Sequence, residues 1–515
     1  MAQNKSRRLL WTVCLAALAA FAAAMVWLHY QQLCSPGGGS DPYTSDLGMH
    51  LAFAQRGMIY STVSLLIGPA YALAGRVGIA VLLAAFHLAA VAVFAYGLRT
   101  ALPDAPRPAR LLVSLVVNLA TAVWMPRGGY WYQGTVGGTI YHNTTYIMLA
   151  PFALLAMLAF YRVWPTMRDD LDLRAYAVYT VLLTVATSFK ASLIFAFAPA
   201  LLVLLIADFV RTRAKNLKNE IIMGCSVFPG VALCFIQANV LFAEEGSGIR
   251  LIFTVPFDHH RMLWGPFNEA GVLGLARSFV FVAAVGLLLG RAAWQRFRYR
   301  FSLFTFAFSL AEALLLVESG ERLYHANLWW GPFICFWVFW LESVSVFLQQ
   351  TRTGAVPRWR LAVCAAALAA VGVHHAGDRP LKALLGGGLQ VDVECQRHGA
   401  ARLGLLAVKF AGFFAAGVGR DDLRAVRALE IGLERLLHAR LADEGVHGIA
   451  LVLIADVARL LVAVPLLGPD RADVAEDVRG VGRVVYADGR GSGRHALELP
   501  VDHLTDQLDG DVACE

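Results

Sequence analysis

The sequence predicts an all-α protein, a bundle of about ten or eleven transmembrane helices packed into the first ~375 residues. Of the 515 residues, 58% are hydrophobic and only 16% are charged, whereas a soluble chain carries roughly a quarter of charged residues. The mean hydropathy is +0.58. Long apolar runs recur along the chain, and short segments with Lys and Arg separate them. This pattern excludes an ordinary soluble domain.

A helix needs ~20 apolar residues to cross ~30 Å of hydrocarbon. The first apolar run follows Lys5, Arg7 and Arg8 and is longer than the apolar region of a signal peptide, so we expect an uncleaved first span. The candidate spans, in order, are Leu9–Tyr30, Val77–Leu98, Leu111–Met125, Tyr146–Tyr161, Ala175–Phe189, Ala191–Val210, Ile221–Ala243, Val272–Leu289, Phe301–Val317, Leu328–Leu348 and the weaker Leu361–Val373.

Lys and Arg predict the orientation of the chain. With a cytoplasmic N-terminus, 20 of them fall in cytoplasmic segments and 7 on the opposite side, as the positive-inside rule requires. The Arg-rich and Ala-rich composition is typical of a GC-rich bacterial genome, so we expect a multi-pass protein of the bacterial inner membrane. Because the basic residues follow the topology, no nucleic-acid partner is expected. Eight scattered Cys without a CxxC pair indicate neither a disulfide framework nor a zinc site.

The segment Ile59–Gly75 is apolar enough to be mistaken for a span. Counting it as one would place Arg99, Arg107 and Arg110 outside and would invert every later loop. We therefore expect residues 31–76 to form one long external loop that contains an interfacial helix.

The chain changes composition near Gly354. Phe, Trp and Tyr number 52 up to this residue and 5 after it. The sequence thus divides into a multi-span membrane domain, residues 1–375, and a compositionally distinct tail, residues 376–515. Short helical periodicity around Leu423–Leu441 fits a small peripheral helical domain. A frame-shifted translation of GC-rich DNA explains the composition equally well, and no function is assigned to the tail.

Polar residues that a membrane anchor would not need gather in the predicted external loops. Asp46 and His50 are four residues apart, so on a helix they share one face. Lys190 lies in a tight external turn between two spans. Together these side chains form the inventory of a site for a phosphorylated or sugar-bearing substrate. The candidate residues are Asp41, Asp46, His50, Tyr141, His142, Asn143, Lys190, Glu321, Arg322, Tyr324, His325 and Asn327.

Several external segments resemble known membrane proteins. The acidic first loop with SDLGMH at its centre resembles the GT-C superfamily of membrane glycosyltransferases. The set YHNTTYIMLAPF, TSFKASLIFAFAPALL and ESGERLYHANLWWG is similar to a family of largely uncharacterised bacterial membrane proteins, over about residues 9–350. Thr144 and Ala191 stand where that family would have Pro, and Ala150 stands where it would have Lys. Because that family is largely uncharacterised, the link to GT-C enzymes is an analogy of fold.

The resemblance implies a mechanism. A carboxylate, Asp46 first and Asp41 second, would deprotonate an acceptor hydroxyl that attacks the anomeric carbon of a sugar carried on polyprenyl phosphate. A cation near the leaving phosphate is needed, for which Lys190, Arg322 and His325 are the candidates. Tyr141, His142 and Asn143 would hold the sugar or a glycan, lipid or protein acceptor. A divalent metal is compatible with Asp41, Asp46 and Glu321, and no motif requires one.

Other interpretations stay open. Asp46 and His50 could form a solvated ion pair, and Lys190 could simply extend to the membrane surface. Glu312 inside a predicted span would suit a transporter or flippase, but the charged groups gather at the outer surface rather than at the middle of the membrane. A polymerase or ligase of surface glycan would share the outer site. A purely structural protein would leave the external clusters unexplained.

Overall fold

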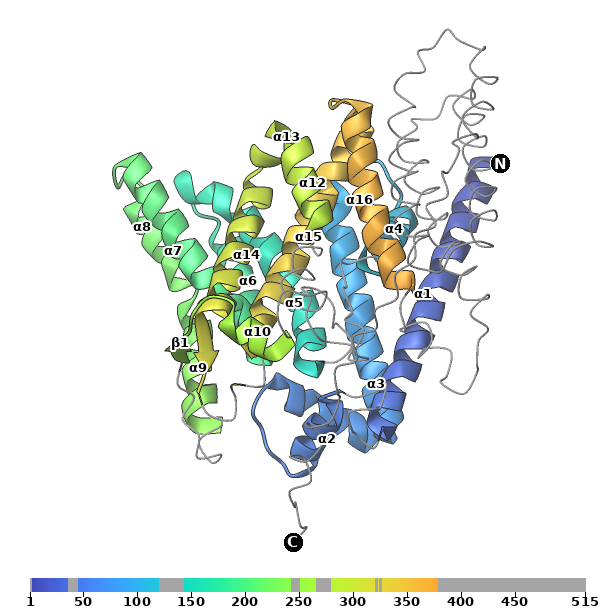
Figure 1. Cartoon of the computed structure of the whole chain (residues 1–515), viewed down its shortest axis with the longest axis vertical. Coiled ribbons are helices and arrows are strands. Elements are labelled where there is room, and N and C mark those ends of the chain that lie inside the picture. The colour runs from blue at the N-terminus through green and yellow to red at the C-terminus, as the bar shows by residue number, and fades with distance from the viewer. Residues whose placement is uncertain are drawn as a thin grey trace, which may run out of the picture. The chain divides into compact units, whose positions relative to one another are not determined.

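The computed structural model describes residues 2–35, 45–119, 143–241, 251–264, 279–319, 323 and 327–377. All of these residues belong to one compact unit, Met1–Pro465. They are helical almost throughout, and the helices are drawn in Figure 1. The tail lies outside the described residues except for 376 and 377, so both interpretations of it stay predictions.

Six stretches of the described residues are helical, long and apolar enough to cross a membrane. This confirms an α-helical, multi-pass membrane bundle, whereas the count of ten or eleven spans and the cytoplasmic N-terminus stay predictions. The six are Arg7–Cys34 in α1 (Ala2–Cys34), Thr62–Thr100 in α3 (Thr62–Gly97) and η1 (Leu98–Thr100), Thr144–Arg168 in α5 (Thr144–Val163) and η2 (Trp164–Arg168), Ser192–Thr212 in α7, Leu217–Asn239 in α8 (Leu217–Cys225), α9 (Phe228–Ile236) and η3 (Gln237–Leu241), and Asn327–Thr353 in η6 (Asn327–Trp329) and α15 (Trp330–Thr353).

The other predicted spans correspond, in the described residues, to helices that are not among these six. They are α4 (Arg107–Leu119), α6 (Leu173–Phe189), α12 (Val280–Leu288), α14 (Phe297–Leu315) and α16 (Arg358–Gly377). Short helices and two strands lie between the long helices: α2 (Leu47–Gln55), α10 (Asp258–Trp264), α13 (Arg291–Trp294), and the strands β1 (Leu251–Phe253) and β2 (Leu316–Glu318), which are distant in the chain and pair in antiparallel fashion.

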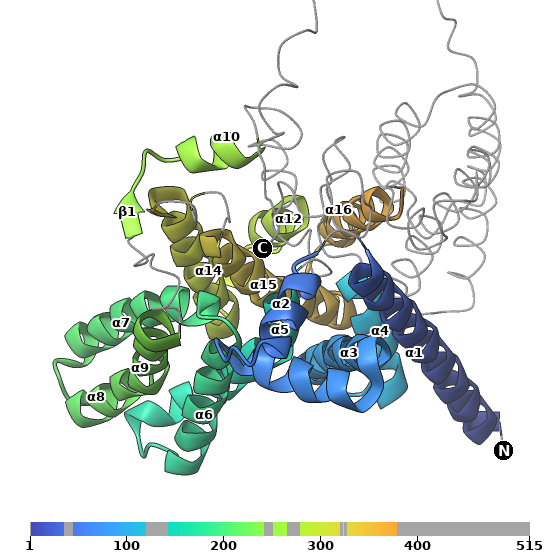
Figure 2. The same cartoon turned by 90° about the horizontal axis from the view of Figure 1, so that it is seen from below.

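Helix α15 forms the centre of the bundle. All of its most apolar stretch is buried, and it packs against α5, α7, α12 and α14 (Figure 2). Aromatic rings fill the interface of α5 with α7 and α14. The ring centroid of Phe160 in α5 lies 5.1 Å from that of Phe197 in α7 and 4.7 Å from that of Phe301 in α14. Close packing of this kind holds helices together in a membrane, where lipid removes the hydrophobic drive.

Helix α3 is broken between its first and second parts. Ala74 and Gly75 are not helical, and Gly75 has φ 59° and ψ −144°, a conformation that glycine adopts without strain. A Cβ on Gly78 would lie 2.1 Å from the carbonyl oxygen of Ala70, so the turn after the break also needs glycine. The break coincides with the end of the predicted interfacial segment, whose position at a membrane surface stays a prediction.

Two imidazoles join α1 to α3 within the apolar bundle. His29 Nδ1 lies 2.8 Å from Gln32 Oε1, and His29 Nε2 lies 3.2 Å from His87 Nε2. Because an amide oxygen only accepts, His29 Nδ1 carries a proton and His29 Nε2 accepts from His87. Both rings are buried. This contact therefore supplies a polar link between two membrane helices.

Candidate functional site

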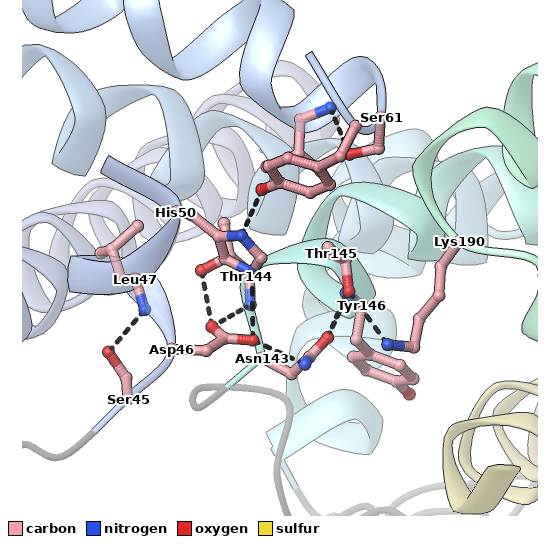
Figure 3. A network of polar contacts seen from close by, with 12 residues as sticks. Ser45, Asp46, Leu47, His50, Ser61, Asn143, Thr144, Thr145, Tyr146 and Lys190 are labelled. Carbon is pink, nitrogen blue, oxygen red and sulfur yellow. Dashed lines mark hydrogen bonds and ion pairs between the residues drawn. The ribbon is translucent and has the colours of Figure 1, made fainter. Parts of the chain in front are cut away.

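Asp46 joins α2 to the beginning of α5, as Figure 3 shows. Asn143 Nδ2 donates to Asp46 Oδ2 at 2.6 Å, and the backbone N and the Oγ1 of Thr144 both donate to Oδ1 at 2.9 Å. The first turn of a helix has N–H groups without helical partners and a positive partial charge. The carboxylate of Asp46 stabilises this end of α5 and fixes α2 against it.

His50 lies one helical turn after Asp46, as the spacing predicts. Its Nε2 is 3.2 Å from Asp46 Oδ2, without the geometry of a hydrogen bond. Its Nδ1 is hydrogen-bonded to the Tyr60 hydroxyl, and both residues are buried. Burial and the charge of Asp46 raise the pKa of Tyr60. The hydroxyl therefore stays protonated and can donate to Nδ1.

Lys190 ends α6 and lies in the turn before α7. Its Nζ donates to Thr145 Oγ1 at 3.3 Å and lies 5.4 Å from the centre of the Trp330 ring. Burial lowers the pKa of Lys190 to about 8, and the charges of Asp46 and Glu318 offset part of this decrease. Lys190 is thus a partly desolvated ammonium that feels the charges of Asp46 and Glu318, and its attraction for an anion exceeds that in water.

The antiparallel pairing of β1 with β2 holds Glu318 in place. Leu251 lies opposite Glu318 in the register, and the preceding Val317 is buried. Successive side chains of a strand point to opposite faces, so the buried Val317 turns Glu318 away from the core. Glu318 Oε2 accepts a hydrogen bond from Asn327 Nδ2 at 2.7 Å. Asn327 lies three residues before Trp330, whose ring contacts Lys190, so these contacts link the paired strands to the site.

Asp46, Lys190 and Glu318 define what we call the three-charge site. A desolvated ammonium can bind an anionic group, and a carboxylate of the same site can accept a proton. Among the described residues, no group of three His, Cys, Asp or Glu could hold a metal ion. Asp41 and Glu321 lie outside them, so the divalent metal considered from the sequence stays a prediction.

Five of the twelve candidate residues lie in the part of the chain that the structure describes. Asp46, His50, Asn143 and Lys190 gather in one network (Figure 3), and Asn327 contacts Glu318 beside it. The remaining candidates lie outside the described residues and are Asp41, Tyr141, His142, Glu321, Arg322, Tyr324 and His325.

Sequence reasoning missed Glu318, Tyr60 and Thr145 as members of the site. Glu318 had a signal, because it is the first acid after the apolar run that forms α14. Thr145 had one as well, since it belongs to the HNTT segment that begins α5. No local pattern marks Tyr60, which reaches His50 only because α2 turns back on the start of α3.

Comparison of the chain with models of protein families, with characterised proteins and with solved structures finds no match. The geometry of the site therefore carries the functional argument.

Proposed function

We propose that the chain is a membrane glycosyltransferase of the GT-C type, which transfers a sugar from a polyprenyl-phosphate donor to a glycan, lipid or protein acceptor at the periplasmic face. One observation supports this most: the buried ammonium of Lys190 donates to Thr145, which hydrogen bonds link through Asn143 to the carboxylate of Asp46. Sugar transfer needs a carboxylate that accepts the acceptor's proton and a cation near the departing phosphate. The acidic first loop, which resembles GT-C enzymes, supports the same assignment.

The test uses the purified full-length chain and a panel of short polyprenyl phosphates that carry radiolabelled mannose, glucose or arabinose. Wild-type protein is expected to release label from the lipid phase with at least one donor. Lys190→Met should reduce the rate ~100-fold or more, because it removes the charge that stabilises the leaving phosphate. Lys215→Met, an exposed lysine in the turn between α7 and α8, is the matched control. No release by the wild type, or an unchanged rate in Lys190→Met, would contradict the proposal.

Transport of the lipid-linked sugar is the second candidate. The buried His29–His87 pair favours it, since polar groups within membrane helices are rare and commonly functional. Proteoliposomes with a fluorescent polyprenyl-phosphate sugar distinguish the two activities. Transport predicts movement between leaflets that is lost in His87→Leu, whereas an enzyme predicts release of sugar that survives this substitution.

A further inference from the structure

Asp46 is surrounded by donors that its charge holds in place. Asn143 and Thr144 direct three hydrogen bonds at its two oxygens, and His50 Nε2 lies 3.2 Å from one of them. Donors that point at a carboxylate stabilise its charged form. A proton taken up by Asp46 would have to displace at least one of these contacts and would loosen the joint between α2 and α5.

Glu318 is placed differently. Among the described residues, its only hydrogen bond is the one that Oε2 accepts from Asn327, and it forms no ion pair within 4 Å. Its carboxylate is only partly buried, so a proton taken up there can pass to water. The backbone beneath it is held by the pairing of Leu251 with Glu318 and by the buried Val317. Glu318 is therefore a carboxylate on a held backbone, and no residue in the described part of the chain donates to its Oε1, which can face a substrate hydroxyl.

We infer that Glu318 is the catalytic base of the three-charge site and that Asp46 is a positioning residue. This assignment rests on the proposed function and changes the role that the sequence suggested for Asp46. It also gives separate roles to the two carboxylates whose charges act on Lys190. Asp46 orders α2, the N-terminus of α5 and, through Thr145, the lysine, while Glu318 acts on the acceptor.

The reaction then balances in one step. Glu318 takes the proton of the acceptor hydroxyl, and the hydroxyl oxygen forms a bond to the anomeric carbon. The bond from that carbon to the phosphate oxygen breaks, and its electron pair stays on the phosphate. The ammonium of Lys190 stabilises the added charge there. The proton on Glu318 then passes to water, which restores the carboxylate.

The experiment compares Glu318→Gln, Glu318→Ala and the control Asp258→Asn in the sugar-release assay. Asp258 is an exposed carboxylate of α10 that pairs with Arg261. Glu318→Gln is expected to lower the rate ~100-fold to ~10,000-fold, the usual contribution of a general base, while Asp258→Asn leaves it unchanged. The dependence of the rate on pH should differ between the wild type and the residual rate of Glu318→Gln, because the substitution removes the base.

The effect of added formate on the rate of sugar release distinguishes a catalytic base from a residue with a structural role. In Glu318→Ala, formate can enter the space of the missing carboxylate and accept the proton, so it should raise the rate at least tenfold, whereas it should not affect Asp46→Ala. A Glu318→Gln rate within threefold of the wild type, or no rescue by formate, would overturn the assignment of the base. In that case turnover by the wild type and its loss in Lys190→Met would still support the proposed function, so the two failures are distinguishable.

Discussion

Exchanging Asp46 and Asn143 tests how α2 is fixed to α5. In the wild type, Asn143 Oδ1 accepts from Thr145 Oγ1 and Tyr146 N, while its Nδ2 donates to Asp46. Asp46→Asn places an amide N–H against another donor in either orientation of the amide. Asn143→Asp places two carboxylates at a contact that is now 2.6 Å. In the double variant Asp46→Asn/Asn143→Asp, an amide again faces a carboxylate, and all the hydrogen bonds that the two side chains make in the wild type can re-form.

The loss in free energy of unfolding that Asp46→Asn causes follows from the buried groups that it leaves without partners. Asn143 and Thr144 are buried, and an unsatisfied buried donor costs about 1–3 kcal/mol. Loss of the carboxylate at the helix N-terminus adds about 0.3–1 kcal/mol. We therefore expect Asp46→Asn to lower the free energy of unfolding by about 2–4 kcal/mol. The double variant should recover most of this, with a coupling free energy of about 2–3 kcal/mol.

The free energy of unfolding is measured in detergent by denaturant titration for the wild type, the two single variants and the double variant. These four values form a double-mutant cycle. Asp172→Asn is the control, since Asp172 also accepts from the first turn of a helix but is exposed, and it should cost less than about 1 kcal/mol. A double variant as unstable as Asp46→Asn would refute the hydrogen-bond account. Sugar release should be retained by the double variant if Glu318 is the base, because the exchange keeps one negative charge beside Lys190.

Three further predictions concern charge and packing. Binding of a polyprenyl phosphate, measured by fluorescence titration, should weaken as the pH rises through about 8, because burial lowers the pKa of Lys190 to that value and the ammonium is lost above it. Gly78→Ala should lower the free energy of unfolding by about 3 kcal/mol or more, because its Cβ would meet the carbonyl oxygen of Ala70. Glu342→Leu should cost about 3–5 kcal/mol, because Arg298, which donates to Glu342 from Nε and Nη2, is left without its partner.

Each of these has its own check. The pH dependence should be absent from Lys190→Met, and binding that is constant from pH 7 to 9 in the wild type would contradict the role of the ammonium. Gly48→Ala is the control for Gly78, since a Cβ there meets no atom within 4 Å. For the ion pair, Arg298→Leu/Glu342→Leu should regain stability relative to Glu342→Leu, and failure to do so would show that the cost arises from lost packing.

The sequence alone was sufficient for the class of the protein, because a membrane imposes local requirements. Each span needs enough apolar residues in a row, and every backbone polar group must be paired within its own helix. Both conditions can be read from short windows of sequence, as in the run that forms α1. The pairing of Asp46 with His50 was predictable for the same reason, since a spacing of four residues places both on one helix face.

The break in α3 was predictable only in part. The bias of Lys and Arg indicated that the segment ending at Gly75 is separate from the following span, and the structure has non-helical residues at Ala74 and Gly75. The shape of the break depends on the close approach of Ala70 to Gly78, which no hydropathy pattern contains.

Only the tertiary structure decided which polar residues share a site. Glu318 joins the site through Asn327 because the pairing of β1 with β2 fixes the chain that leaves α14, and Thr145 contacts the lysine because α5 and α6 pack side by side. Tyr60 reaches His50 because α2 folds back on the start of α3. Such contacts join segments that are distant in the chain or related by a turn. The packing of the helices sets the geometry of these contacts, and the neighbouring residues in the sequence do not. The residues that carry charge could therefore be found in the sequence, but their division into a base, a positioning group and a phosphate-binding cation follows from the fold.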